Sequence, residues 1–301
     1  KPIPSKMNNL KNFLKRKIRR NTFLWKFLLT IYVFIKKIKE YERMIVYRRF
    51  LRGKYGLEIG GPSNFFREIL PIYSIIRGLD GCNYGKITIW EGNIKEGQTY
   101  EYHPNKKKGY QFICDAVDLK FIPSLSYDFI LASHVIEHIA NPIKALLEWL
   151  RILKENGILL LVVPHRDGTF DHNRPITTLK HLLDDFEKNI KEDDLTHLPE
   201  ILELHDLTLD PQAGDFDAFK KRSLDNFNNR CLHHHIFDTK LVVEIFDYLG
   251  LQVLSVDVVL PYHIIVMGKK VPKGKKIKNG VYLRRASNMS ISSKNKIMRA
   301  S

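Results

Sequence analysis

The sequence predicts an α/β fold with a doubly wound, mostly parallel sheet, and three observations support it. Leu57 and Ile59 flank an acid on a short apolar strand, which runs directly into two glycines. Further acids follow later apolar stretches, and residues 158–163 form a continuous apolar run, typical of a strand buried on both faces. At 301 residues the chain can bury one such core and carry an added subdomain.

The glycine turn of residues 54–63 is the first candidate binding element. Gly60 and Gly61 follow Glu58 and leave no side chain in the way of a ligand. In an open α/β sheet, nucleotide-like ligands bind at the carboxyl ends of the strands. Taken alone, the same turn also fits a structural hairpin, so the interpretation depends on the pieces that follow.

Three more pieces follow in order. Asp80 comes 22 residues after Glu58, about where an acid holds ribose hydroxyls in dinucleotide-binding folds. Residues 110–119 form a predicted strand that ends near Asp115. Residues 127–139 run from a predicted strand into a helix through Ser133 and His134.

These four pieces resemble the class I S-adenosylmethionine-dependent methyltransferases over residues 53–164 and again over 236–270. The resemblance implies a Rossmann-like sheet, methyl transfer and S-adenosylmethionine as cofactor. It also implies the cofactor-binding residues: Glu58, Gly60 and Gly61 at the methionine part, Asp80 at the ribose, Asp115 and Ala116 at the adenine, and Ser133 and His134 on the pocket floor. One departure from the family pattern is that the second glycine is adjacent to the first and precedes Pro62.

The charge distribution divides the chain into three predicted segments. Residues 1–54 hold 17 Lys or Arg and two acids, residues 269–301 hold 11 and no acid, and the remainder has a net charge of −10. We therefore expect a basic amphipathic N-terminal segment (1–52), a methyltransferase domain (53–270) and a basic disordered tail (271–301). Any affinity for polyanions then belongs to the two ends.

The N-terminal segment contains a mostly apolar run, residues 23–35, with helical spacing. It is shorter than the roughly 20 residues that a membrane-spanning helix needs. The run fits either a helix packed on the core or an interfacial helix on an anionic membrane surface. Three scattered cysteines indicate a reducing compartment. The sequence thus predicts a cytoplasmic protein, peripheral on the inner membrane face if the helix is interfacial.

An insert at residues 165–235, expected to be helical, holds eight of the twelve histidines. Both of its ends meet the carboxyl edge of the predicted sheet, beside the cofactor site. The candidates for a general base are His165, His172, His234 and His235, and Arg174 is a candidate for pairing with an anionic group of the acceptor. The alternatives are hydrogen-bonded rim histidines, and for Arg174 a salt bridge to Asp171 or Asp185.

A metal site is the other use for clustered histidines. His233, His234 and His235 are consecutive, so their side chains cannot all converge on one ion from a strand or helix. Two of them with Asp171 or Asp206 could do so. Because no recognised ligand spacing is present, the sequence predicts no metal site.

Three functions are compatible with these features. The first is O-methylation of a sugar, glycan or other small acceptor near a membrane, because residues 164–175 resemble the insert of bacterial methyltransferases associated with surface-polysaccharide synthesis. The second is RNA methylation, suggested by total charge; the acidic core and Ala132-Ser133-His134, where amino-group methyltransferases of bases have Asn/Asp-Pro-Pro-Tyr, argue against it. The third is a non-catalytic cofactor-binding module, against which the retained Glu58, Gly60, Asp80 and Asp115 argue.

Overall fold

The computed structural model describes residues 42–287 and 289, and the chain divides into two compact units, residues 1–50 and 51–301. In the first unit, residues 42–50 are helical. The apolar run at 23–35 lies outside the described residues, so the predicted amphipathic helix stays a prediction. Within the described part of the chain, no helix is long and apolar enough to cross a membrane.

The second unit is built on an eight-stranded sheet in the order β5-β6-β2-β1-β7-β8-β10-β9. β6, β2, β1, β7 and β8 are parallel to their neighbours in this group, while β5, β10 and β9 pair antiparallel. This confirms the prediction of a doubly wound, mostly parallel sheet. The strands are β1 (Tyr55–Ile59), β2 (Gly78–Asn83), β5 (Gly97–Tyr100), β6 (Gly109–Ile113), β7 (Tyr127–Ser133), β8 (Leu153–Pro164), β9 (Leu251–Val259) and β10 (His263–Lys270), with a separate pair, β3 (Ile87–Thr88) and β4 (Gly92–Asn93).

The strand order reverses at β1. From β1 the chain builds outward to β2 and β6 on one side and to β7 and β8 on the other. Ile59, the last residue of β1, is level with Cys82 of β2 and Ala132 of β7. Three carboxyl strand ends therefore meet at one edge, where open α/β sheets form their ligand crevice.

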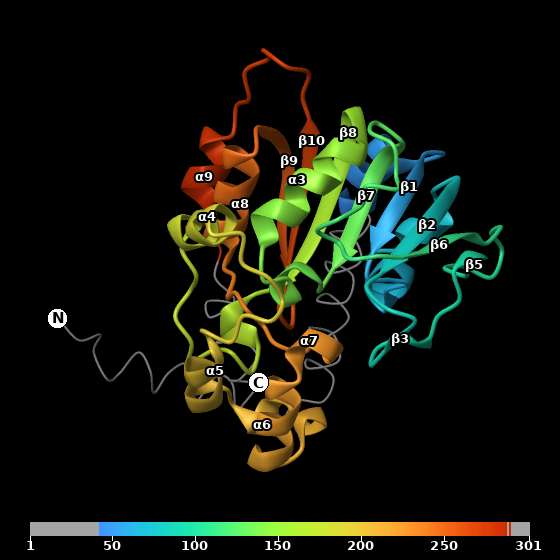
Figure 1. Ribbon diagram of the computed structural model, residues 1–301. Helices are drawn as coiled ribbons and strands as arrows, with labels where there is room; N and C mark the ends of the chain where they lie inside the picture. The colour runs from blue at the N-terminus through green and yellow to red at the C-terminus, as the bar shows by residue number, and fades with distance from the viewer. Residues whose placement is uncertain (1–41, 288, 290–301) are drawn as a thin grey trace, which may run out of the picture. The chain divides into compact units, whose positions relative to one another are not determined.

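Helices α3 (Pro142–Ile152), α4 (Leu179–Glu187), α8 (Thr239–Tyr248) and α9 (Gly280–Ala286) pack together and on the last strands (Figure 1). Two of them begin at Asn141 and Asp238, residue types that favour the start of a helix. Asn141 accepts a hydrogen bond from the Lys144 N–H, and Asp238 accepts one from the Leu241 N–H. The apolar faces of these helices bury large side chains such as Trp149 in the main core.

Two elements differ from the sequence-based expectation. Asn156-Gly157 is a pair typical of a helix end, so the sequence predicts that α3 stops there. Instead α3 ends at Ile152, because Leu153 already pairs with Tyr127 across the sheet, and the next four residues form an irregularity in β8. The expected disordered tail contains α9, which Asn279 anchors by hydrogen bonds to Val253 N and Leu251 O. The lysine-rich composition of the tail did not reveal this buried asparagine.

The insert folds as short helices, as expected. They are α4, α5 (Leu198–Leu204), α6 (Phe216–Leu224) and α7 (Asn226–Asn229), joined by the 3₁₀ turns η4 (Arg166–Gly168), η5 (Leu207–Leu209) and η6 (Pro211–Ala213). α5, α6 and α7 lie together beyond the lower edge of the sheet in Figure 1. The remaining short elements, η1 (Phe65–Ile69), η2 (Ile72–Ser74) and η3 (Ile136–His138), follow β1 and β7.

Candidate active site

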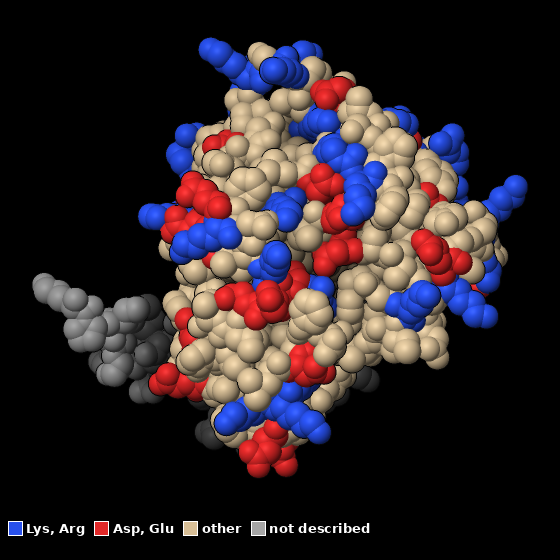
Figure 2. Space-filling view, viewed as in Figure 1, with Lys and Arg blue, Asp and Glu red and all other residues tan. Residues whose placement is uncertain are grey.

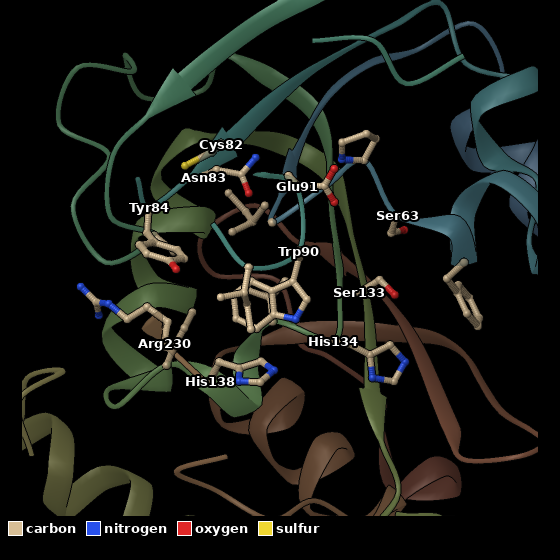
Figure 3. Close-up of a pocket in the computed structure, with 18 of the residues that line it drawn as sticks. Ser63, Cys82, Asn83, Tyr84, Trp90, Glu91, Ser133, His134, His138 and Arg230 are labelled. Carbon is tan, nitrogen blue, oxygen red and sulfur yellow. The ribbon is translucent and has the colours of Figure 1, made fainter. Parts of the chain in front are cut away.

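A cavity of about 850 Å³ opens where the strand order reverses. Its wall includes residues at the carboxyl ends of β1, β2 and β7, and residues just beyond β6. Figure 3 shows Asn83, Tyr84, Trp90, His134 and His138 around this pocket. The volume lies in the range of cofactor and small-molecule sites.

The two glycines of the turn play different parts. Gly60 lines the cavity with a φ of 72°, and a Cβ there would collide with a neighbouring valine. Gly61 does not line it, because a Cβ there would meet the Glu58 carboxylate and the Tyr100 hydroxyl. Glu58 is fully buried and accepts hydrogen bonds of 2.7 Å from the hydroxyls of Tyr73 and Tyr100. Glu58 thus supports the turn from inside the fold and does not line the pocket.

Asp80, expected at the ribose, lies inside the sheet, three residues before the end of β2. Its carboxylate accepts hydrogen bonds from the hydroxyls of Tyr55 and Tyr127 and from an N–H of β6, at 2.7–2.8 Å. Asn83, the last residue of β2, does line the cavity and donates to the Gly61 carbonyl at 2.9 Å. Asn83 therefore lines the cavity, and Asp80 does not.

The far end of the cavity is lined by Asp115 and Ala116, beyond β6. Asp115 Oδ2 accepts a hydrogen bond from Arg230 Nη2 at 3.1 Å, and Arg230 Nη1 lies 2.9 Å from Glu192 Oε2. The Arg230 guanidinium also lies over the Tyr84 ring, 5.5 Å from its centroid. Since Arg230 belongs to the insert, it ties the insert to the end of the pocket predicted to hold adenine.

Ser133 and His134 line the cavity at the end of β7. His134 Nε2 lies 2.8 Å from His263 Nδ1, and His134 Nδ1 lies 3.4 Å from Glu137 Oε1. Burial lowers the pKa of His263 to about 3, and His134 adds to the shift. For Glu137, burial raises the pKa, but the hydrogen bond with His134 and the electrostatic effects of His134, His138 and His233 together lower the pKa overall. The two rings line the cavity, and the buried Glu137 carboxylate lies behind His134.

The wall residues suit S-adenosylmethionine: an open glycine turn, an amide at the end of β2, and a carboxylate beyond β6. The chain matches the family described as a methyltransferase domain over residues 38–212, more than half of its length. The chain belongs to this methyltransferase family. The family and the fold imply S-adenosylmethionine as the cofactor, as the sequence predicted.

Solved structures similar to this methyltransferase share low identity with it. A SAM-dependent methyltransferase from Aquifex aeolicus is 12% identical with a TM-score of 0.41, and the match covers 76% of this chain and 89% of that one. A putative S-adenosylmethionine-dependent methyltransferase from Listeria monocytogenes is 14% identical with a TM-score of 0.42, covering 77% and 98%. No curated protein matches the chain.

His138 of η3 is the third histidine on the cavity wall of the methyltransferase. Its Nδ1 lies 3.2 Å from the Leu232 carbonyl oxygen, and its ring centroid lies 5.1 Å from that of Trp90. Burial, with a smaller effect from His233, lowers the pKa of His138 to about 4. At neutral pH the ring is therefore uncharged; donating through Nδ1, it keeps a lone pair on Nε2.

The four insert histidines expected to supply a base do not line the cavity. Each has a partner elsewhere: His165 accepts from the Asp167 N–H, His172 lies 2.9 Å from Asp206, His234 accepts from Asn226 Nδ2, and His235 lies 3.2 Å from the Ala140 carbonyl oxygen. The structure thus favours the rim or core alternative for all four.

Arg174, expected to orient the acceptor, is 1% exposed and also lies off the cavity. It donates to Glu200 Oε1 at 2.9 Å, to Asp171 Oδ1 at 3.1 Å and to the His233 carbonyl at 2.8 Å. Although burial opposes it, His233 and Arg174 together lower the pKa of Asp171 to about 2. The salt bridge to Asp171 that the sequence left as an alternative is the observed arrangement.

Sequence reasoning missed much of the pocket wall, including the polar and aromatic residues Asn83, Tyr84, Trp90, His138, His263 and Arg230. Two of them carried a usable signal. His138 follows a predicted strand by five residues, and His263 starts a closing strand that runs antiparallel, so it begins at the edge where the parallel strands end. For Trp90 and Arg230, which arrive from loops, the sequence holds no comparable signal.

Two groups of described residues have the composition and spacing to hold a metal ion. One is Glu137, His138 and His233, beside the cavity. The other is His181, Asp185, His197 and His235, within and at the end of the insert. Neither is the pairing with Asp171 or Asp206 that the sequence suggested, because Asp171 bonds His233 and Arg174, and Asp206 bonds His172.

Proposed function

We propose that this methyltransferase methylates a hydroxyl group of a sugar, glycan or other small acceptor, with His138 as the general base. The observation that carries the proposal is the uncharged His138 ring on the pocket wall beside Trp90. Bound S-adenosylmethionine would supply an activated methyl group on a sulfonium. The residues of the chain then have to position the acceptor and accept its proton.

His138 is better placed for this than the other two wall histidines, because His134 has partners on both ring nitrogens and His263 is more deeply buried than His138. Both ring nitrogens of His134 face other groups, His263 and Glu137, and Nδ1 of His263 faces His134. His138 uses only Nδ1, for the Leu232 carbonyl. Among the described residues nothing hydrogen-bonds its Nε2, so this nitrogen can take a proton from a bound hydroxyl.

The surroundings of His138 fit a sugar-like acceptor. Trp90 is 51% exposed at the cavity and offers an apolar ring face. Gln212 and Tyr262, also on the wall, can hydrogen-bond hydroxyls. An apolar face next to polar side chains matches the apolar and polar surfaces of a sugar ring.

The predicted association with surface-polysaccharide synthesis is part of the same proposal. Its support is the basic N-terminal segment, residues 1–52, and the basic tail, which flank an acidic core. On the face drawn in Figure 2, acidic and basic side chains of the core are interspersed. We infer that the chain ends hold the enzyme at the cytoplasmic surface of a membrane, where a lipid-linked glycan would be its acceptor.

The catalytic proposal is tested with methyl-labelled cofactor and glycan extracts, followed by mass spectrometry of the products. His138→Gln should lower turnover by about 100- to 10,000-fold, the contribution of a general base, with cofactor affinity retained. His172→Gln is the matched control, because His172 lies off the cavity, and its turnover should be unchanged. Label appearing only in added RNA, or full turnover in His138→Gln, would overturn the proposal.

The membrane proposal is tested by co-sedimentation with anionic vesicles. Replacing Lys36, Lys37 and Lys39 by Glu in the full chain should abolish binding that the unchanged chain shows. The control is the same replacement at Lys106, Lys107 and Lys108, three lysines of the core. Equal loss in both triple variants, or none in either, would contradict attachment through the N-terminal segment.

A further inference from the structure

Four side chains from three segments of the insert region converge on one point. His181 and Asp185 lie on successive turns of α4, His197 immediately precedes α5, and His235 lies between α7 and α8. Each offers one ligand atom, and these four atoms lie within 4.8 Å of one another. The group is separate from the cofactor cavity, whose wall contains none of the four.

The distances within this group match those between ligands of a tetrahedral ion. Zinc bonds of about 2.0–2.1 Å to nitrogen and oxygen place neighbouring donors roughly 3.3 Å apart. His181 Nε2 lies 3.1 Å from His197 Nε2 and 3.3 Å from Asp185 Oδ2, and His235 Nε2 lies 3.7 Å from Asp185 Oδ2. An ion between these atoms would replace the contact between His181 and His197 and the contact of His235 Nε2 with the Ala140 carbonyl oxygen.

The group is also poorly satisfied by the protein alone. Asp185 is 8% exposed, and its Oδ2 is buried without a hydrogen-bond partner. His181 and His235, which lie next to this oxygen, would balance its charge only when protonated. A buried carboxylate oxygen that lacks a hydrogen-bond partner and faces imidazole nitrogens is well placed to share a cation with them.

We propose that His181, Asp185, His197 and His235 bind a zinc ion that stabilises the insert. Nitrogen donors with one carboxylate oxygen suit zinc, and four protein ligands leave no open coordination position, as in structural sites. The role is separate from methyl transfer and does not depend on the acceptor.

A stabilising ion has a clear use here, because the outer part of the insert has a small core. Its buried apolar cluster consists of Ile201, Ala213, Phe219 and Leu232. Small cores of this kind are commonly supplemented by a metal or by disulfides. The proposed ion would join α4, the start of α5 and the segment that returns to α8.

The test uses the full chain, stripped with a chelator and titrated with zinc chloride alone. We expect one zinc per chain by elemental analysis and a higher melting temperature with zinc. His181→Ala and Asp185→Asn should each weaken zinc binding by at least the roughly 10- to 100-fold typical of losing a supporting group around a metal. His172→Ala is the matched control, since His172 pairs with an aspartate in the same insert outside the group, and it should keep full zinc affinity.

His181 is a partly exposed member of the group, with 40% of its side chain accessible, so its replacement should leave the fold intact. Zinc that remains bound in both variants but is lost in His233→Ala would assign the ion to the group with Glu137 and His138, and overturn the proposal. It would also be overturned if the stripped chain takes up no zinc and a chelator leaves the melting temperature of the purified protein unchanged.

Discussion

The histidines on the pocket wall and those of the insert resemble each other in the sequence but have different environments. His138 keeps one ring nitrogen without a hydrogen bond from any described residue, and its ring lines the cavity. His172 and His234 are paired with Asp206 and Asn226, away from the cavity. Position near the carboxyl edge of the sheet is therefore not enough to make a histidine functional; its ring must also face the pocket with a free nitrogen.

The charged groups of the two regions differ in the same way. In the pocket, Arg230 bridges Asp115 and Glu192 at 15% side-chain exposure, so solvent still reaches the pair. In the insert, Arg174 and Asp171 are almost completely buried. The first arrangement can exchange partners with a ligand, whereas the second holds the insert together.

The largest expected effect comes from breaking this buried network. Arg174→Met should lower the free energy of unfolding by about 3–5 kcal/mol, because it leaves Asp171 as a buried charge without its arginine partner. Chemical denaturation measures the loss.

Lys180→Met is the matched comparison, since Lys180 pairs with Asp184 at the surface of the same insert, and its stability should be unchanged. A normal unfolding midpoint in Arg174→Met, together with altered acceptor kinetics, would return Arg174 to the acceptor-binding role expected from the sequence.

The second prediction concerns buried histidines, in which the two regions are alike. Burial lowers the pKa of His234, in the insert, and of His263, on the pocket wall, to about 3. Below the ordinary histidine pKa of about 6.5, the unfolded chain gains a proton at each of these rings and the folded chain does not. The free energy of unfolding therefore decreases as the pH is lowered, by about 1.4 kcal/mol per pH unit for each ring. Glu58 offsets the effect of one of the two rings. Burial raises the pKa of Glu58 to about 7, so the folded chain binds a proton there at a higher pH than the unfolded chain does.

The net expectation for these three groups is a loss of about 2 kcal/mol between pH 6.5 and 5. Denaturation curves at several pH values measure it. In His234→Gln the pH dependence should become shallower, because one of the buried rings that gain a proton only in the unfolded chain has been removed. His172→Gln should keep the original slope, and an identical slope in both variants would show that His234 titrates normally in the folded protein.

The sheet and the glycine turn could be predicted from the sequence because their signals are local. Apolar runs, the caps Asn141 and Asp238, and Gly60 at the end of β1 all depend on a few neighbouring residues. α9 was missed because its anchor is tertiary: Asn279 bonds the backbone of β9, more than 25 residues away. Composition alone could not show that contact.

The site residues were harder to predict, because the role of each side chain depends on the residues that it contacts in the folded protein. Arg174 and the insert histidines were plausible candidates until their contacts were known, and those contacts join segments far apart in the chain. Cys82 and Cys114 illustrate the same limit: they are 32 residues apart, yet their sulfur atoms lie 3.4 Å from each other on neighbouring parts of the sheet. The separation of two residues in the sequence does not predict such a contact.

The last and smallest effect separates Asp80 from Asn83. Counting residues from the glycine turn led to Asp80, but the parallel register sets Asp80 level with Leu57, in mid-strand, and Cys82 level with Ile59. The residue at the strand end, Asn83, is therefore the one that can reach a ribose. Asn83→Ala should weaken binding of S-adenosylmethionine by about 0.5–1.5 kcal/mol, the typical net contribution of one hydrogen bond.

Asp80→Asn should lower stability and leave cofactor binding nearly unchanged. The Asp80 carboxylate accepts three hydrogen bonds inside the sheet, and the amide nitrogen that replaces one of its oxygens cannot accept. The folded variant should bind the cofactor nearly as well as the unchanged chain but unfold more easily. Calorimetry and denaturation on both variants give a crossed pattern if the register decides the site. If affinity drops in Asp80→Asn and not in Asn83→Ala, the acid identified by its distance from the glycine turn holds the ribose after all.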